Sequence, residues 1–173
     1  ENKKLRELIN ETVQSEDVFA KVLIDKDSPY LKSIVLNKGS KDNIKIGMAI
    51  VDRSYLVGKI IEVNYTNSRA LLVSDLNSKI PVLLEPIDIH AVLSGTGKNY
   101  GAIEYTKDEY KKKLTSNEII VYTSGYGGLF KPGLPIGKIV TNNFNKDNQV
   151  NFFSDFRQLD YVKIVSYEIG SGN

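Results

Sequence analysis

Hydrophobic and polar residues alternate along most of this chain in short runs that turn residues separate. From residue 17 onward, runs of about four to eight β-branched and aromatic residues recur, as is typical of strands. The first six predicted strands are Val18–Ile24, Ser33–Leu36, Met48–Val51, Leu56–Val63, Ala70–Val73 and Ile80–Leu84. The next six are Ile87–Leu93, Gly101–Tyr105, Ile119–Tyr122, Ile136–Thr141, Val150–Phe153 and Tyr161–Ser166. Short, evenly spaced strands of this kind predict an all-β barrel or sandwich.

Each series of strands is small, and closure into a barrel removes the exposed edges of a sheet. We therefore expect a mainly β fold with two six-stranded β-barrels. The first barrel is predicted over residues 17–86 and the second over residues 87–168. The closing segment 169–173, rich in glycine and serine, is predicted to be a flexible tail.

The first 16 residues have a helical period instead. The apolar residues Leu5, Leu8, Ile9 and Val13 have helical spacing, and with Thr12 they are the candidate dimerisation residues. Leu5, Leu8 and Thr12 fit positions a, d and a of a heptad, but two turns are too few to establish a coiled coil. Two interpretations stay open, a short amphipathic helix packed on its own domain and the end of a longer dimeric coiled coil.

The most unusual stretch is residues 123–140, TSGYGGLFKPGLPIGKIV, which holds five glycines and two prolines between two β-branched runs. Glycine permits backbone angles with positive φ, and proline cannot sit in a central strand, so this stretch predicts a strand, a long shaped loop and a strand. Tyr126, Leu129 and Phe130 are unusually apolar for such a loop. These three residues are the candidate exposed, partner-binding set, and two outcomes stay open for Phe130: a structural plug in the barrel mouth, or an exposed anchor for another protein.

Tyr100 and Tyr105 join this candidate partner-binding set, because tyrosines near loops and strand ends are enriched at interfaces. The stretch also repeats an earlier one. LVGKII at residues 56–61 and PIGKIV at residues 135–140 share an apolar residue, glycine, lysine and two β-branched residues. The repeat predicts two related β modules, with Gly58 and Gly137 in equivalent places.

The same residues carry a family resemblance. TSGYGGLFKPGLPIGKIV resembles the signature of MreC, a family of bacterial rod-shape and cell-elongation scaffolds, and GMAIVDRSYLVGKIIEV and NSRALLVSDLNSKIPVLL are also similar to it. The similarity extends over roughly residues 33–165. Two loop positions depart from the pattern: Lys131 stands where the family often has a second proline, and Arg53-Ser54-Tyr55 replaces a turn that usually contains glycine.

The resemblance implies a helix followed by two β-barrels, and it favours the coiled-coil interpretation and a homodimer. It also implies a non-enzymatic scaffold that controls cell shape by binding and regulating a class B penicillin-binding protein. MreD would be a further partner, with RodZ and MreB linked more indirectly. The implied location is the periplasm, with an inner-membrane anchor upstream of the fragment given by this sequence.

Composition narrows the chemistry. The net charge is +2 and lysine far outnumbers arginine, which argues against a nucleic-acid partner. The chain has no cysteine and one histidine, so disulfides, thiolate metal sites and cysteine nucleophiles are excluded, and no metal or cofactor is expected. No run of eighteen or more apolar residues, the length of a membrane span, occurs.

The main alternative is a serine hydrolase with a trypsin-like double barrel. It would need His90, a carboxylate such as Asp88, and a serine such as Ser94 or Ser124. Ser124 does not lie in a G-x-S-x-G elbow, because a threonine and a tyrosine precede it. A nucleic-acid or polysaccharide-binding β module is a third class, but the chain has neither a basic stripe nor an aromatic platform of convincing spacing.

Overall fold

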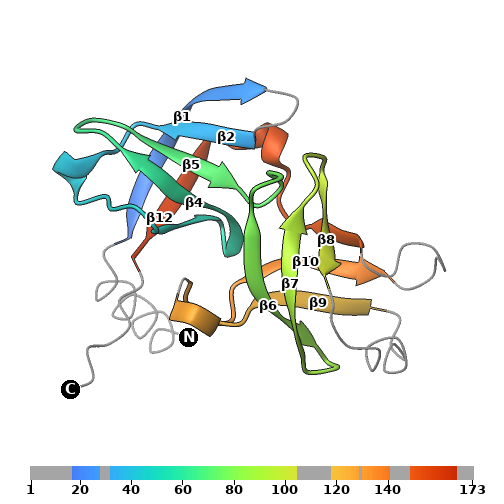
Figure 1. Ribbon diagram of the computed structural model, residues 1–173. Coiled ribbons are helices and arrows are strands. Elements are labelled where there is room, and N and C mark those ends of the chain that lie inside the picture. Colours follow the sequence, from blue (N-terminus) through green and yellow to red (C-terminus); the bar gives the residue numbers. More distant parts are fainter. Residues whose placement is uncertain (1–16, 28–31, 105–117, 129, 141–148, 167–173) are drawn as a thin grey trace, which may run out of the picture.

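The structure is a computed structural model that describes residues 17–27, 32–104, 118–128, 130–140 and 149–166. Within those ranges the chain forms twelve antiparallel strands and three single-turn 3-10 helices, and it contains no α-helix (Figure 1). The turns are η1 (Ser40–Asp42), η2 (Tyr126–Gly128) and η3 (Phe156–Gln158). All twelve predicted strands are confirmed, with ends that differ by a few residues.

Two closed six-stranded barrels are present, as predicted. The first contains β1 (Val18–Asp27), β2 (Lys32–Leu36), β3 (Ala49–Asp52), β4 (Tyr55–Val63), β5 (Ser68–Leu72) and β12 (Tyr161–Val165). The second contains β6 (Lys79–Glu85), β7 (Ile89–Gly95), β8 (Tyr100–Glu104), β9 (Glu118–Thr123), β10 (Pro135–Val140) and β11 (Gln149–Phe152). Alternate residues of a strand point to opposite faces of its sheet, so each barrel fills its interior with every second side chain.

The predicted division of the chain between the barrels at residue 86 is wrong for two strands. Around the first barrel the order is β3-β4-β5-β2-β1-β12, and around the second it is β9-β10-β11-β8-β7-β6. Strands β1–β5 of the first barrel therefore correspond to β7–β11 of the second. The sixth strand of each barrel comes from the other half of the chain: β12 completes the first barrel and β6 completes the second. In Figure 1, β12 lies beside β1 in the first barrel, while β6 lies beside β7 and β9. Residues 17–86 and 87–168 are two structural repeats that exchange their last strands.

A buried turn carries the chain from β5 into the second barrel. Asp75 is fully buried there, and its carboxylate accepts hydrogen bonds from the backbone N–H of Lys32 at 2.8 Å and of Asn77 at 2.7 Å. The same turn bonds to the second barrel, because Gly97 N–H donates to the Ser74 carbonyl at 2.8 Å and Gly95 N–H donates to the Ser78 carbonyl at 3.0 Å. These bonds direct β6 away from the first barrel and into the second.

The buried side chains form two clusters. The smaller one fills the first barrel and includes Ile34, Ile50 and Ile60. The larger one fills the second barrel and continues into the first barrel through residues of β3 and β4, among them Val51 and Leu56. The two barrels therefore share apolar packing at their junction, where β4 contacts β10.

The predicted N-terminal helix lies outside the described residues. Its candidate dimerisation contacts Leu5, Leu8, Ile9, Thr12 and Val13 do so too, and they stay predictions. The predicted tail at residues 169–173 is likewise outside them.

Candidate functional site

The glycine-rich loop after β9 is closed at its base by Thr123. This buried threonine donates from its hydroxyl to the Lys131 carbonyl at 2.6 Å and accepts from the Leu134 N–H at 2.9 Å. Its backbone N–H donates to the Leu134 carbonyl, and its carbonyl accepts from the Gly133 N–H, both at 2.9 Å. Gly125 begins the loop with φ of 75°, and a side chain there would strike Pro132. These bonds fix the base of the loop.

The structure separates the two aromatic residues of this loop. Tyr126 is 77% exposed, whereas Phe130 is only 3% exposed and belongs to the larger apolar cluster. Of the two outcomes left open for Phe130, the structural one is therefore correct, and its place in the candidate exposed set is wrong. Apolar burial explains the difference, since enclosing an aromatic ring is worth about 1.5–3 kcal/mol. Leu129 lies outside the described residues.

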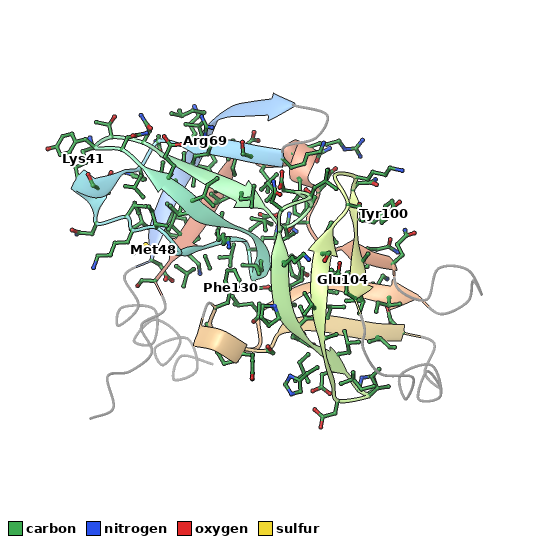
Figure 2. The ribbon with its side chains drawn as sticks, viewed as in Figure 1. Lys41, Met48, Arg69, Tyr100, Glu104 and Phe130 are labelled. Carbon is green, nitrogen blue, oxygen red and sulfur yellow. The ribbon has the colours of Figure 1, made fainter. Side chains whose placement is uncertain are left out.

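Phe130 also lines a small hollow against the first barrel. The other lining residues are Ile46, Gly47, Lys59, Ile60 and Ile61, and the hollow has a volume of about 180 Å³. Figure 2 shows Phe130 at the junction of the two barrels, below β4. The loop therefore belongs to the interface between the barrels, with Tyr126 as its exposed aromatic residue.

Tyr100, the remaining described aromatic candidate, does not join Tyr126. Tyr100 is half-buried at the start of β8 and pairs with Asn151 across the sheet. Figure 2 shows it well separated from Phe130, on the far side of the second barrel. Tyr105 lies outside the described residues. Among the described candidates, Tyr100 and the glycine-rich loop with Tyr126 and Phe130 do not form one surface.

An exposed apolar patch that the sequence analysis missed lies on the first barrel. Phe19 is 72% exposed, Leu23 52% and Tyr161 64%. In the ladder between β1 and β12, Phe19 pairs with Lys163 and Lys21 pairs with Tyr161. Phe19 and Tyr161 are therefore diagonal neighbours on the outer face, about 7–8 Å apart between backbones. Because Val18, Ala20 and Val162 point inward, the alternation along each strand could have predicted that Phe19 and Tyr161 point outward. It could not have predicted that the two rings are neighbours.

We call Phe19, Leu23 and Tyr161 the β1–β12 patch. Its charged neighbours are Lys21, which is exposed, and Lys163, whose ammonium lies 3.4 Å from the Asp17 carboxylate. Large exposed side chains gathered on adjacent strands are more typical of an interaction surface than of a solvated face, where such residues occur singly.

The groups of the hydrolase alternative are not assembled into a triad. His90 is exposed on β7, and Asp88 is in the preceding turn with φ of 55°. Ser94 is four residues along the same strand from His90, a separation of about 13 Å. The Ser124 hydroxyl accepts from the Tyr126 N–H at 3.1 Å instead of contacting an imidazole. Nothing in this arrangement favours hydrolysis.

Two features are absent from the described part of the chain. It holds no group of three histidine or acidic side chains that could bind a metal ion. It also holds no helix of the length and apolarity that crossing a membrane requires.

The double barrel, the glycine-rich loop and the repeat match a known family. The family model of the rod shape-determining protein MreC, barrel core, matches residues 22–166. This chain belongs to the MreC family. The resemblance drawn from its loop sequences is thereby confirmed.

The relatives are cell shape-determining MreC proteins. The one from Cereibacter sphaeroides is 33% identical over 149 residues, covering 86% of this chain and 48% of the relative. The one from Haemophilus influenzae is 32% identical over 158 residues, covering 89% of this chain and 43% of the relative. The chain thus spans somewhat under half the length of these relatives.

Solved structures share the fold at lower identity. The crystal structure of MreC from Pseudomonas aeruginosa has a TM-score of 0.76 at 22% identity, covering 87% of this chain and 99% of that one. MreC in a complex with the penicillin-binding protein PBP2 from Helicobacter pylori has a TM-score of 0.56 at 13% identity, covering 87% of this chain and 99% of that one. These likenesses support the double-barrel fold.

Proposed function

We propose that this chain is the barrel region of a non-enzymatic scaffold for bacterial cell elongation, and that it binds and regulates a class B penicillin-binding protein. Membership of the MreC family is the observation that carries the proposal. The complex of the Helicobacter pylori relative with PBP2 supports the choice of partner. Regulation then needs a scaffold that binds one conformation of the synthase more tightly than another, because only differential affinity shifts a conformational equilibrium.

The β1–β12 patch is the proposed contact surface. Aromatic residues supply most hot spots of protein interfaces, because they bury a large area at little cost in side-chain entropy. Phe19 and Tyr161 offer two such rings on a rigid barrel wall, where the paired strands already fix the backbone. Tyr126 is a second exposed ring, on the glycine-rich loop, and it stays a candidate for the same partner.

The test is the affinity of the full-length protein for the penicillin-binding protein of the same organism. We expect Phe19→Ser and Tyr161→Ser each to weaken binding about tenfold or more, as for hot-spot residues. Tyr65→Ser is the matched control, because Tyr65 is 71% exposed on the same barrel but outside the patch. It should leave binding unchanged. Unaltered binding in both patch variants would reject the patch, and a loss only in Tyr126→Ala would move the contact to the loop.

Further partners follow from the same proposal. MreD would bind the scaffold directly, while RodZ and MreB would be linked to it indirectly. The location would be the periplasm, with the full-length protein anchored in the inner membrane. Self-association as a homodimer would run through residues 1–16. Analytical ultracentrifugation should then show a concentration-dependent dimer that Leu5→Asp with Leu8→Asp weakens, whereas a dimer unaffected by this pair would place the contact on the barrels.

A further inference from the structure

A groove of about 300 Å³ lies where the two barrels meet, on the side where the β11–β12 connection passes the β7–β8 hairpin (Figure 1). Four separate segments of the chain line it. The first barrel contributes Lys32, Leu72 and Ser74, the hairpin contributes Lys98 and Asn99, and the β11–β12 connection contributes residues 152–157. The strand exchange creates this groove, because it brings the end of β11 and the start of η3 between the barrels.

Cations outnumber anions along the groove. Lys32, Lys98 and Arg157 line it, and the single lining carboxylate is that of Asp155. Asp155 caps η3 by accepting from the Arg157 N–H at 3.0 Å, and it also lies 3.4 Å from the Arg157 side-chain Nε. Neither lysine has an ion pair with any described residue. An anion entering the groove would therefore meet two ammonium groups that are not held in ion pairs, with Asp27 as the cross-strand neighbour of Lys32.

Two lining serines have buried hydroxyls without a hydrogen-bond partner. Ser74 is 2% exposed and Ser154 is 9% exposed, and the Oγ atom of each is unpaired within the described part of the chain. A buried unpaired hydroxyl costs roughly 1–3 kcal/mol, so such groups generally have a partner. Ser68 and Ser94 are unpaired too but do not line the groove, so the combination with the lysines marks the site.

Aromatic rings form the third feature. Phe152, Phe153 and Phe156 line the groove, and the rings of Phe152 and Phe156 pack with centroids 5.0 Å apart. A simple inorganic ion would leave these rings without contact, whereas a ligand with an apolar part would cover them. We propose that the groove binds an organic anion, a phosphate or carboxylate carried on an apolar group. Lys32 and Lys98 would hold the charge, Ser74 and Ser154 would donate hydrogen bonds, and the phenylalanines would contact the apolar part.

The experiment is a titration of the isotopically labelled protein with phenyl phosphate, followed through the backbone amide signals of Asn99, Ser154 and Arg157. We expect saturable shifts at these amides. Lys32→Ala with Lys98→Ala should weaken binding about tenfold or more, the order expected for losing charge-assisted hydrogen bonds. The control pair, Lys41→Ala with Lys45→Ala, removes the same charge from two exposed positions that do not line the groove, and Figure 2 shows Lys41 at the end of the first barrel away from the second. It should change the affinity less than twofold.

Two more probes test whether the ligand has an apolar part and whether the anion belongs to a lipid headgroup or to a soluble molecule. Inorganic phosphate should bind several-fold more weakly than phenyl phosphate, and equal affinity would reject the apolar part of the proposal. Phosphatidylcholine vesicles with and without phosphatidylglycerol separate the sources. Binding only to the phosphatidylglycerol vesicles, lost in the Lys32/Lys98 variant, assigns a lipid headgroup, and phenyl phosphate binding without vesicle binding assigns a soluble anion. No saturable shift, or equal weakening by the control pair, overturns the anion site.

Discussion

Gly58 in β4 and Gly137 in β10 each follow a one-residue bulge in the ladder to the preceding strand. Leu56 pairs with Val51 and Gly58 with Ile50, so Val57 is the extra residue. Pro135 pairs with Tyr122 and Gly137 with Val121, so Ile136 is the extra residue. The sequence repeat thus encodes one local device used twice, and the predicted equivalence of the two glycines is confirmed. A bulge bends its strand, and these are the two strands that meet at the junction of the barrels.

Substitution of either glycine by alanine should destabilise the protein by about 1–3 kcal/mol or more, as for overpacked sites. A Cβ at Gly58 would collide with the Leu71 carbonyl oxygen, and one at Gly137 would collide with that of Asn151. Both obstacles are backbone atoms, so the strands must move apart. Urea unfolding measures the loss.

Gly127→Asn is the control for both glycine variants. Gly127 has open space around it and φ of 76°, which asparagine tolerates. The urea midpoint of the Gly127→Asn variant should stay close to that of the unsubstituted protein. If Gly58→Ala and Gly137→Ala unfolded at the same urea concentration as the unsubstituted protein, the neighbouring strands would not lie as close to these glycines as the structure shows.

Phe130→Ala should cost about 3–5 kcal/mol, the usual range for truncating a buried aromatic residue. The cavity would open at the barrel junction, where Phe130 packs in the larger cluster. Tyr126→Ala, on the same loop, should change stability by less than about 0.5 kcal/mol because its ring is exposed. Thermal and urea unfolding of the two variants check this contrast, and equal effects would show that the loop packs differently.

Neither repeat should fold alone. A fragment of residues 17–86 has only five strands for the first barrel and carries β6 without its neighbours β7 and β9. We expect each half, 17–86 and 87–168, to be unfolded by circular dichroism, and an equimolar mixture to regain β structure. The intact chain should unfold in one transition. Independent folding of either half, or two separate transitions, would be incompatible with the exchanged strands.

Asp75→Ala should destabilise the chain by about 3 kcal/mol, because the backbone N–H groups of Lys32 and Asn77 would lose a charged acceptor in a buried place. Asp75→Asn keeps one side-chain oxygen and should cost less. Asp160→Ala, at an exposed acidic residue, is the control and should be near neutral. If Asp75→Ala were as stable as the Asp160→Ala control, the hydrogen bonds of Asp75 would not be needed to direct β6 into the second barrel.

The sequence by itself determined the strands, the two barrels, the repeat and the family. Short β-branched runs between turn residues locate strands without knowledge of their partners, and the paired LVGKII and PIGKIV motifs report a local bulge that depends only on nearby residues. The alternation of Val18, Ala20 and Val162 also fixes which residues face inward. All of these are properties of neighbours along the chain.

Only the tertiary structure decided which strands share a barrel. β6 and β12 have the same alternation whichever barrel they join, so their exchange depends on contacts such as the Asp75 turn rather than on their own pattern. The same applies to Phe130, which the sequence left between plug and anchor until the neighbouring barrel was placed against it. The β1–β12 patch and the anion groove could also be found only from the tertiary structure. The residues of each lie far apart in the sequence and come together only in the folded chain. These features depend on packing between residues that are distant in sequence, and a local sequence pattern does not contain that information.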